Sequence, residues 1–362
     1  MIDLRSDTIT KPTLEMRNAM FIAEVGDDVY EEDKTMKRLE ERVANLFHKE
    51  SALFFPSGTM SNLTAILTWC SSKRGTEIIV GDKSHIFLYE QSGASQFGGV
   101  SYRPIINLPD GTMDISTILE CIRETDIHEP STELICIENT HNVCGGKILP
   151  ESFLDNLQKI SREKNIPIHL DGARIWNALT KTKTEPAEMA KYVDSLSVCL
   201  SKGLGAPVGS LLIGTKSFIE KARIIRKALG GGMRQIGILG AAGLKALDDF
   251  EKDILEIDHI RCQRIAETFR KYDRWCQIED SIDTNILFIK IKNIKNCKIE
   301  QIATMFREKN ILVSVWSQTL LRMVFHRDLT ETDIREIEKA IHAIFLMIYT
   351  FCIFPNLGNA QF

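Results

Sequence analysis

The sequence has no excess of positive charge. Its 362 residues carry a formal net charge of −4, its pI is about 6.1, and no basic stripe runs along it. Nucleic acid and acidic membrane surfaces are therefore not the expected partners. Hydrophobic residues make up 44% of the chain, enough to fill a large core, so we expect a folded globular protein that acts on a small molecule.

Paired cysteines are missing as well. The nine cysteines are odd in number, are spread from Cys70 to Cys352, and form no CxxC motif. This pattern favours reduced thiols over a disulfide framework. The N-terminal stretch MIDLRSDTITKP contains acidic residues and no long apolar segment, so it predicts no targeting peptide. We therefore expect a cytoplasmic location.

Long hydrophobic runs are also scarce. The stretch AIFLMIYTFCIF at residues 343–354 is almost wholly apolar, but it has twelve residues and is followed by Pro355. Roughly 20 residues are needed to span a bilayer. We expect this stretch to end a last helix that is buried by the core or by a partner subunit. Weak membrane contact is the alternative.

No internal repeat or low-complexity linker divides the chain, and helix-like and strand-like segments alternate instead. Helical spacing of apolar residues occurs at 33–47 and 150–165, and apolar runs typical of buried strands lie at 77–82, 133–139, 166–171, 195–201 and 209–214. This alternation predicts an α/β fold, a large domain with a mostly parallel sheet between helices. Beyond residue 250 the pattern changes, and strands at 284–291, 311–316 and 321–326 predict a smaller α+β domain. We expect an N-terminal arm and large domain at 1–250, a small domain at 251–342 and an apolar tail at 343–362.

Two common phosphate-binding motifs, the GxGxxG fingerprint and the Walker A loop, are absent. The stretch FFPSGTMSN at 54–62 offers another arrangement, in which an apolar run and a turn precede helical spacing. Backbone N–H groups at the start of that helix, with the hydroxyls of Ser57 and Thr59, would bind a phosphate. Ordinary helix capping is the alternative. A single phosphate fits this short loop better than a pyrophosphate.

Unusual polar residues follow several predicted strands, where ligands gather in open α/β sheets. Asp171 and Arg174 lie in HLDGAR, Lys202 lies in SVCLSKGLGAPVGS, and His85 lies in VGDKSHIFLYE. A single residue of these types is commonly a cap, a solvated side chain or a structural residue. Lys202, however, is followed by glycines that let a ligand come close. Partial desolvation there favours the neutral amine needed for Schiff-base chemistry.

Taken together, these features predict pyridoxal 5′-phosphate (PLP) as the cofactor. Its aldehyde would react with Lys202, and its phosphate would bind at Gly58 and Thr59. Asp171 would keep its ring nitrogen protonated, which makes the ring an electron sink, and His85 would stack on the flat ring. No metal is expected.

Seven motifs occur in order along the chain from residue 2 to about 340: LRSDTITKPT, VGDDVYEED, PSGTMSN, ENTHN, HLDGARIWNA, SVCLSKGLGAPVGS and LGGGMRQIGILGAAG. They resemble the low-specificity L-threonine aldolases, PLP-dependent lyases of the aspartate-aminotransferase-like fold (fold type I) related to the beta-eliminating lyases. The resemblance implies retro-aldol cleavage of L-threonine or L-allo-threonine to glycine and acetaldehyde, through an external aldimine and a quinonoid. It also implies a homotetramer, a dimer of dimers with active sites at dimer interfaces, that serves glycine biosynthesis and threonine catabolism.

The resemblance further implies roles for residues that bind the cofactor. Lys202 would form the Schiff base, Asp171 would pair with the pyridinium, and His85 would stack on the ring. Arg174 would bind the cofactor's phenolic oxygen or the substrate. Arg234, in GGGMRQ, would complete the site from a neighbouring subunit.

For the substrate, the resemblance implies that Ser6 and Arg322 hold the carboxylate. Arginine suits this task because its planar fork pairs with both carboxylate oxygens. Tyr30, in DDVYEED, would contact substrate from a neighbouring subunit, and His141, in ENTHN, would lie near the β-hydroxyl. The base that removes the hydroxyl proton stays open between His85 and His141, acting directly or through a water molecule.

Two alternatives to this function remain. One is another fold-type-I PLP lyase, either β-eliminating or similar to serine hydroxymethyltransferase. The other is a catalytically silent PLP-fold scaffold that docks a partner or a membrane through its apolar tail. The presence of all the expected polar residues argues against the silent scaffold.

Overall fold

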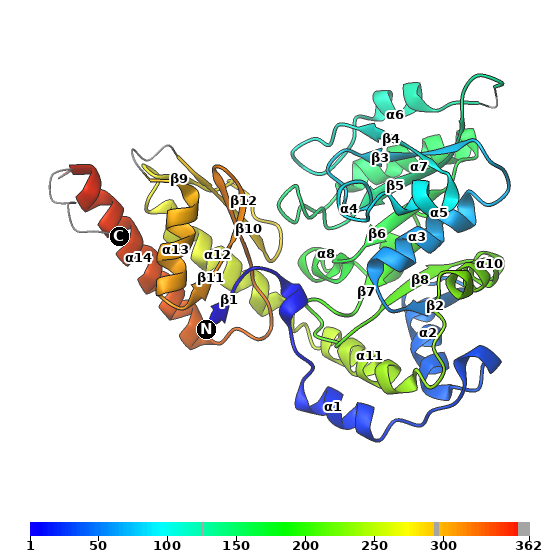
Figure 1. Cartoon of the computed structure of the whole chain (residues 1–362), viewed down its shortest axis with the longest axis horizontal. Helices are drawn as coiled ribbons and strands as arrows, with labels where there is room; N and C mark the ends of the chain where they lie inside the picture. Colours follow the sequence, from blue (N-terminus) through cyan, green and yellow to red (C-terminus); the bar gives the residue numbers. More distant parts are fainter. Residues whose placement is uncertain (125, 293–296, 354–362) are drawn as a thin grey trace. The chain divides into compact units, whose positions relative to one another are not determined.

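The computed structural model describes residues 1–124, 126–292 and 297–353. Its contacts divide the chain into two compact units. The larger unit comprises Lys11–Asp253, and the smaller unit comprises Met1–Thr10 together with the chain from Ile254 onward. In Figure 1 the N-terminal segment, in dark blue, lies beside the yellow to red elements of the smaller unit. The chain therefore crosses between the two units twice.

A seven-stranded sheet forms the centre of the larger unit (Figure 1). Its strands, in spatial order, are β2 (Ser51–Phe55), β8 (Ser210–Gly214), β7 (Ser195–Cys199), β6 (Ile168–Gly172), β5 (Ser131–Glu138), β3 (Thr76–Gly81) and β4 (Ser101–Ile105). Strand β8 runs antiparallel to both of its neighbours, and the other six strands all run in one direction. The predicted α/β fold with a mostly parallel sheet is confirmed. The five apolar runs that the sequence assigned to this sheet form β3, β5, β6, β7 and β8.

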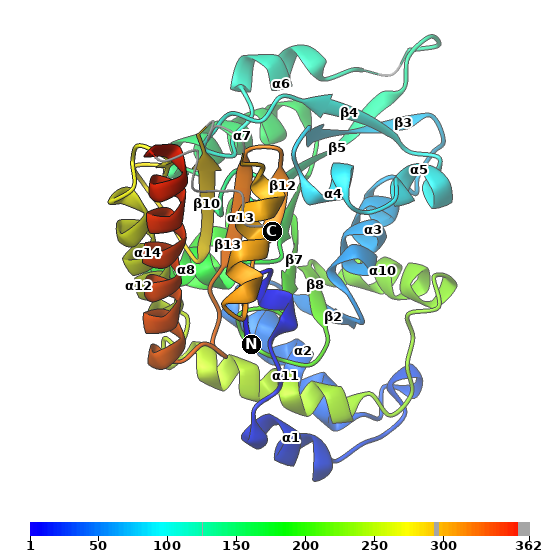
Figure 2. The same ribbon diagram turned by 60° about the vertical axis from the view of Figure 1, so that its left-hand side comes forward.

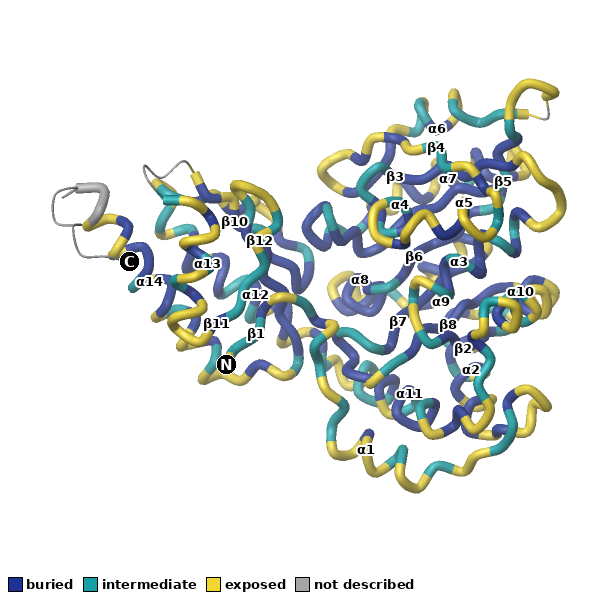
Figure 3. Tube along the Cα trace, in the orientation of Figure 1, coloured by how far each residue is buried: buried dark blue, intermediate teal, exposed yellow. Residues whose placement is uncertain are grey.

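Burial explains why these runs are continuously apolar. Every residue of β3, β6, β7 and β8 is buried, as the dark blue centre of the larger unit in Figure 3 shows. Because successive side chains point to opposite faces of a sheet, full burial means that both faces are covered.

Helices provide this cover, while α1 packs on α11. The helical segments of the larger unit are α1 (Leu14–Phe21), the short 3-10 segment η2 (Asp28–Tyr30), α2 (Lys34–Leu46), α3 (Gly58–Trp69), α4 (His85–Leu88), α5 (Gly93–Gly98), α6 (Ile115–Cys121), α7 (Glu151–Lys164), α8 (Ile175–Thr182), α9 (Pro186–Ala190), α10 (Lys216–Ala228) and α11 (Gly237–Phe250). The Asp33 side chain accepts a hydrogen bond from Met36 N–H and caps α2. Pro150 directly precedes α7. The helices predicted at 33–47 and 150–165 are thereby confirmed.

The smaller unit is an α+β arrangement, as predicted. Its antiparallel sheet has the order β12 (Ser314–Ser317), β13 (Leu320–Val324), β10 (Ile286–Ile291) and β9 (Cys276–Gln277), and β1 (Ile2–Asp3) pairs in parallel with β11 (Ile311–Leu312). Its helical segments are η1 (Asp7–Ile9), α12 (Glu256–Arg270), α13 (Ile299–Glu308) and α14 (Glu331–Ile353). Helices α12 and α13 pack on the antiparallel sheet, and α14 packs on both helices (Figure 2).

The last helix, α14, contains the first part of the predicted apolar tail. Phe345 and Ile348 are buried in the core of the smaller unit, and the Phe345 ring stacks on Tyr272 with 4.7 Å between ring centroids. Leu346, by contrast, is 64% exposed, so α14 is buried on one face. Residues 354–362 of the tail lie outside the described residues. Among the described helices, none has the length and apolar character needed to span a membrane.

Candidate active site

The strands that run in one direction bring their carboxyl ends to a single edge of the larger sheet. Because β8 is antiparallel to both β2 and β7, β2 is parallel to β7, and parallel pairs join β7, β6, β5 and β3. This edge carries Ser57 after β2, His85 after β3, His141 after β5, Asp171 within the end of β6, and Lys202 after β7. Five strand ends thus deliver sequence-predicted site residues to the edge where α/β sheets bind ligands.

The residues predicted to bind the phosphate lie at the start of α3. Ser57 Oγ accepts a hydrogen bond from Met60 N–H at 3.2 Å, so this hydroxyl is the helix cap. The N–H groups of Gly58 and Thr59 lie in the first turn, where backbone donors have no partner within the helix. A Cβ on Gly58 would lie 2.9 Å from Cys199 Sγ. Glycine therefore lets α3 begin close against β7.

The sequence did not predict the side chains that hold β2, the strand before this turn. Both backbone groups of Phe54 are held by buried side chains: Phe54 N–H donates to Glu40 Oε1 at 2.8 Å, and Arg226 Nη1 donates to Phe54 O at 2.7 Å. Arg226 also pairs with Asp28 at 2.8 Å. Burial raises the pKa of Glu40 to about 7. Since β2 is an edge strand, these side chains satisfy groups that no neighbouring strand reaches.

A buried set of polar residues, which we name the Asn62 network, supports Asp171. It consists of Asn62, Glu90, His169 and Asp171, none more than 6% exposed. Asn62 Nδ2 donates to Asp171 Oδ2 at 2.9 Å and to Glu90 Oε1 at 3.0 Å. Asn62 Oδ1 faces His169 Nε2 at 3.1 Å. Ala173 N–H donates to the other oxygen of Asp171 at 3.0 Å, so the Asp171 carboxylate has a partner on each oxygen.

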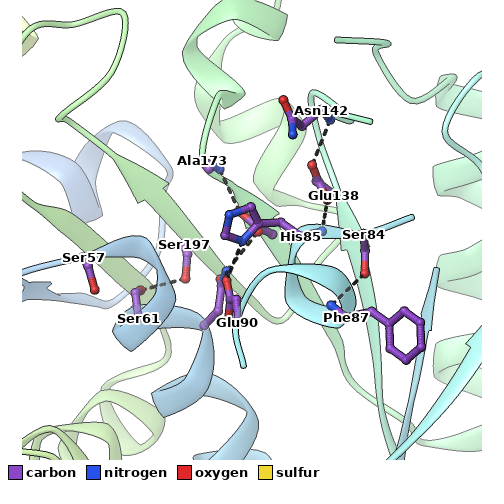
Figure 4. A network of polar contacts seen from close by, with 12 residues as sticks. Ser57, Ser61, Ser84, His85, Phe87, Glu90, Glu138, Asn142, Ala173 and Ser197 are labelled. Atoms are coloured by element: carbon purple, nitrogen blue, oxygen red, sulfur yellow. Dashed lines mark hydrogen bonds and ion pairs between the residues drawn. The ribbon is translucent and has the colours of Figure 1, made fainter. Parts of the chain in front are cut away.

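His85 joins this network at its exposed side. Its Nδ1 atom lies 2.9 Å from Glu90 Oε1 (Figure 4). One ring nitrogen of His85, one carboxylate oxygen of Glu90 and one of Asp171 lie within 4.8 Å of one another. Burial lowers the pKa of His85, but the hydrogen bond that His85 donates to Glu90 and the charges of Asp171, Glu90 and Glu138 outweigh burial and raise this pKa overall.

Glu138, at the end of β5, connects two segments that carry candidate histidines. Its Oε2 atom accepts a hydrogen bond from the backbone N–H of His85 at 2.7 Å, and its Oε1 atom accepts one from Asn142 N–H at 2.9 Å (Figure 4). His141 precedes Asn142 directly, and Arg174 Nη1 donates to Asn142 Oδ1 at 3.5 Å. Glu138 was not predicted, although it follows an apolar strand in the same way as Asp171.

Lys202 lies half-buried in the loop between β7 and β8. Gly205 N–H donates to Lys202 O at 2.9 Å, and Gly205 has a φ of 80°, which a residue with a Cβ rarely adopts. The glycines after Lys202 therefore build the turn that follows the lysine.

Ser6 and Arg322 belong to the smaller unit, where the N-terminal segment runs beside β13. Val324 N–H donates to Leu4 O at 2.8 Å, and Arg322 Nη1 donates to Arg5 O at 3.2 Å. Ser6 directly follows Arg5, and its hydroxyl accepts a hydrogen bond from Thr8 N–H at 3.2 Å. The structure thus brings Ser6 and Arg322 to the same segment.

Tyr30 and Arg234 meet at the surface of the larger unit rather than at a strand end. The Arg234 guanidinium lies 6.0 Å from the centre of the Tyr30 ring and pairs with Asp27 at 2.9 Å. Tyr30 is 73% exposed. These two residues form a pair of their own, away from the strand ends that carry the other predicted site residues.

Solved structures share this fold. The threonine aldolase of Leishmania major matches with a TM-score of 0.79 at 18% identity, over 96% of this chain and 100% of that chain. Serine palmitoyltransferase of Sphingomonas wittichii matches with a TM-score of 0.75 at 16% identity, over 96% and 88% of the two chains. The fold is that of the fold-type-I PLP-dependent enzymes, as predicted.

Sequence relatives then define the family. The beta-eliminating lyase family matches residues 3–293. Low-specificity L-threonine aldolase 1 of Arabidopsis thaliana is 42% identical over 335 residues, which cover 92% of this chain and 93% of that protein. The low specificity L-threonine aldolase of Escherichia coli (strain K12) is 40% identical over 337 residues, 93% and 97% of the two chains. The chain belongs to the beta-eliminating lyase family, and the resemblance carried by its motifs is confirmed.

Enzymes of this family depend on PLP, which confirms the predicted cofactor. The described residues fit it. Glu90 and Asp171 are two buried carboxylates. Of the two imidazoles near them, His85 has a raised pKa, whereas burial lowers the pKa of His169 to about 4. A protonated ring nitrogen next to Asp171 would therefore balance the second negative charge. Lys202 would meet the aldehyde, and the first turn of α3 would hold the phosphate.

Proposed function

We propose that this protein cleaves L-threonine and L-allo-threonine to glycine and acetaldehyde. The observation that carries the proposal is the gathering of Ser57, His85, His141, Asp171 and Lys202 at one sheet edge. Relatives at 40% and 42% identity that are named low-specificity L-threonine aldolases support the choice of substrate. Glycine biosynthesis and threonine catabolism are the processes such an enzyme would serve.

When bound, PLP supplies an aldehyde that reacts with amines and a pyridinium ring that accepts the electron pair of a bond broken at the substrate Cα. Lys202 is the amine that would hold the cofactor. Asp171 would keep the ring nitrogen protonated, and Asn62 and Ala173 hold the Asp171 carboxylate in place. The N–H groups of Gly58 and Thr59 would bind the phosphate.

The proposal also assigns residues to the substrate. Arg322 and Ser6 hold the carboxylate of the amino acid, which decides which bond at Cα breaks. Arg174 binds the cofactor's phenolic oxygen or the substrate. His85 stacks on the cofactor ring, and His141 lies near the β-hydroxyl.

The proposed assembly is a homotetramer, a dimer of dimers in which Tyr30 and Arg234 complete the site of a neighbouring subunit. Exposed apolar side chains in the segment that precedes Tyr30 support a subunit interface: Phe21 is 90% exposed and Ile22 is 78% exposed. A cytoplasmic location is proposed from the unpaired thiols of the described cysteines. Light scattering after size-exclusion chromatography tests the assembly, and a monomer would contradict it.

An aldehyde assay tests the reaction. Purified protein is incubated without folate with L-threonine, L-allo-threonine or D-threonine, and acetaldehyde is measured through a coupled dehydrogenase. Both L-isomers should yield acetaldehyde, and D-threonine should not. Lys202→Ala should reduce the rate by more than about 1,000-fold and remove borohydride-fixed cofactor from the lysine peptide. Lys181→Ala, at an exposed lysine of the same unit, is the control and should change neither.

Two outcomes would redirect the proposal. Release of pyruvate and ammonia from amino acids with a β-leaving group, without acetaldehyde from L-threonine, would indicate a β-eliminating lyase. A requirement for tetrahydrofolate would indicate chemistry similar to serine hydroxymethyltransferase.

A further inference from the structure

Glu90 is a buried carboxylate to which the proposed reaction assigns no task. It is 6% exposed, and its Oε1 atom contacts two nitrogen atoms, His85 Nδ1 at 2.9 Å and Asn62 Nδ2 at 3.0 Å. A carboxylate oxygen only accepts hydrogen bonds, so both nitrogens donate to it. Burial raises the pKa of Glu90, and the hydrogen bonds from His85 and Asn62 oppose that rise.

The orientation of the Asn62 amide supports this assignment. The same side of the amide that faces Glu90 also faces Asp171 Oδ2 at 2.9 Å. An amide oxygen between two carboxylates would be repelled, whereas an NH2 group can donate one hydrogen to each. The nitrogen of Asn62 therefore faces the carboxylates, and its oxygen faces His169.

The hydrogen bonds of His169 agree with this orientation of the Asn62 amide. Burial lowers its pKa to about 4, so the ring is neutral near pH 7 and carries one hydrogen. That hydrogen is on Nε2, because Nε2 lies 3.1 Å from the amide oxygen of Asn62. Nδ1 then accepts from Ser195 Oγ at 2.9 Å, and Ser195 Oγ itself accepts from Trp69 Nε1 at 2.9 Å.

For His85 the consequence is a fixed tautomer. Its hydrogen is on Nδ1, held by Glu90, so in the neutral ring Nε2 has the free electron pair. Glu90, Asp171 and Glu138 raise the pKa of His85 against the effect of burial. A proton taken up at Nε2 is therefore stabilised by the carboxylate on the opposite side of the ring.

His141 has the reverse arrangement. Its Nδ1 accepts a hydrogen bond from Cys144 N–H at 3.4 Å, so in the neutral ring the hydrogen is on Nε2. The ring is 1% exposed, and within the described part of the chain Nε2 has no hydrogen-bond partner. His141 therefore presents an N–H donor and not an electron pair.

We propose that Glu90 is a positioning residue that keeps the hydrogen of His85 on Nδ1, which makes His85 Nε2 the proton acceptor of the site and leaves His141 Nε2 as a hydrogen-bond donor. This inference rests on the proposed function, because the proton concerned is that of the substrate β-hydroxyl. As the aldehyde forms, the O–H bond breaks, its electron pair stays with oxygen, and the proton moves to His85 Nε2 directly or through one water. Glu90 then balances the charge of the imidazolium.

Histidine C2 hydrogen exchange, read by mass spectrometry on the holoenzyme, tests the proposal because it reports the pKa of each histidine separately. In Glu90→Gln the pKa of His85 should fall by at least about one unit, a tenfold loss of proton affinity. Hydrogen exchange at the exposed His128 should be the same in both proteins. In the pH profile of kcat/KM for L-threonine, the limb on the acidic side should move to lower pH by a similar amount.

Glu77→Gln is the matched control, because Glu77 is also buried and hydrogen-bonded, to Thr132. It should leave the His85 titration unchanged. An unchanged His85 titration in Glu90→Gln, or an unmoved acidic limb, would overturn the proposal. If circular dichroism shows that Glu90→Gln does not fold, a wild-type His85 pKa at or below 6.5 would overturn it. The exchange measurement needs no turnover, so a protein that does not cleave L-threonine would contradict the proposed function and leave this test intact.

Discussion

At the scale of single residues, His169 shows how burial makes the stability of the protein depend on pH. Its ring is fully buried, and burial lowers its pKa to about 4. The unfolded chain, in which a histidine has a pKa near 6.5, therefore binds a proton below that pH while the folded chain does not. Stability is lost as the pH falls from about 6.5 to about 4, by roughly 3 kcal/mol from this residue alone.

His169→Gln tests this coupling. Glutamine keeps an N–H donor for Asn62 but has no charge to gain, so the variant should become more stable relative to the wild type as the pH falls from 7 to 5. Urea unfolding at pH 7, 6 and 5 measures the difference. His128→Gln, at an exposed position, is the control and should show no such trend. A stability difference for His169→Gln that does not change with pH would contradict the argument.

The residues proposed to bind the cofactor could be predicted from the sequence, and the residues that hydrogen-bond to them could not. Asp171 and Lys202 follow strands and stand in recognisable motifs. Asn62 and Glu90 lie in or beside helices, where a polar residue has no distinguishing pattern, and their importance comes from contacts across 28 and 109 positions of sequence. Glu138 is the exception, because an acidic residue after an apolar strand could have been noticed.

At the scale of secondary structure, α14 separates the buried from the exposed part of the apolar tail. Two adjacent residues show the division most clearly. Phe345 is fully buried and stacks on Tyr272, whereas Leu346 is 64% exposed. Helical periodicity explains this alternation, since one stripe of an amphipathic helix faces the core.

Phe345→Ala should destabilise the protein by about 3 to 5 kcal/mol, because it removes a large buried ring and leaves a cavity. Leu346→Ala is the matched control and should change the free energy of unfolding by no more than about 0.5 kcal/mol. Urea unfolding followed by tryptophan fluorescence measures both. Equal effects of the two substitutions would mean that this face of α14 does not contribute to the core.

Strands and long helices were predicted from apolar periodicity because burial on one or two faces determines those patterns. The two-residue strands β1 and β9 escaped prediction, and the strand predicted at 311–316 covers β11 and most of β12. Two residues are too few to show a period, and the pairing of β1 with β11 depends on a partner at the far end of the chain.

At the scale of the whole molecule, the proposed cofactor residues and the proposed carboxylate residues belong to different units. Cofactor binding and substrate binding should therefore respond separately to mutation. Arg322→Lys keeps the positive charge but loses the planar fork. We expect KM for L-threonine to rise by about 100-fold, equivalent to about 2.7 kcal/mol. Cofactor content, measured by absorbance after gel filtration, should stay at the wild-type value. Loss of cofactor from this variant would contradict the assignment.

The association of residues 1–10 with the chain beyond residue 254 has a consequence for biosynthesis. Ser314 donates a hydrogen bond to Arg5 O across 309 positions of sequence, and Ile2 pairs with Ile311. All of Lys11–Asp253 leaves the ribosome before Ile311 and Ser314 are made. The larger unit can therefore fold during translation while the first ten residues have no partner to pair with. Closing so long a loop is slow. The segment that carries Ser6 is thus among the first made and the last to be fixed in place.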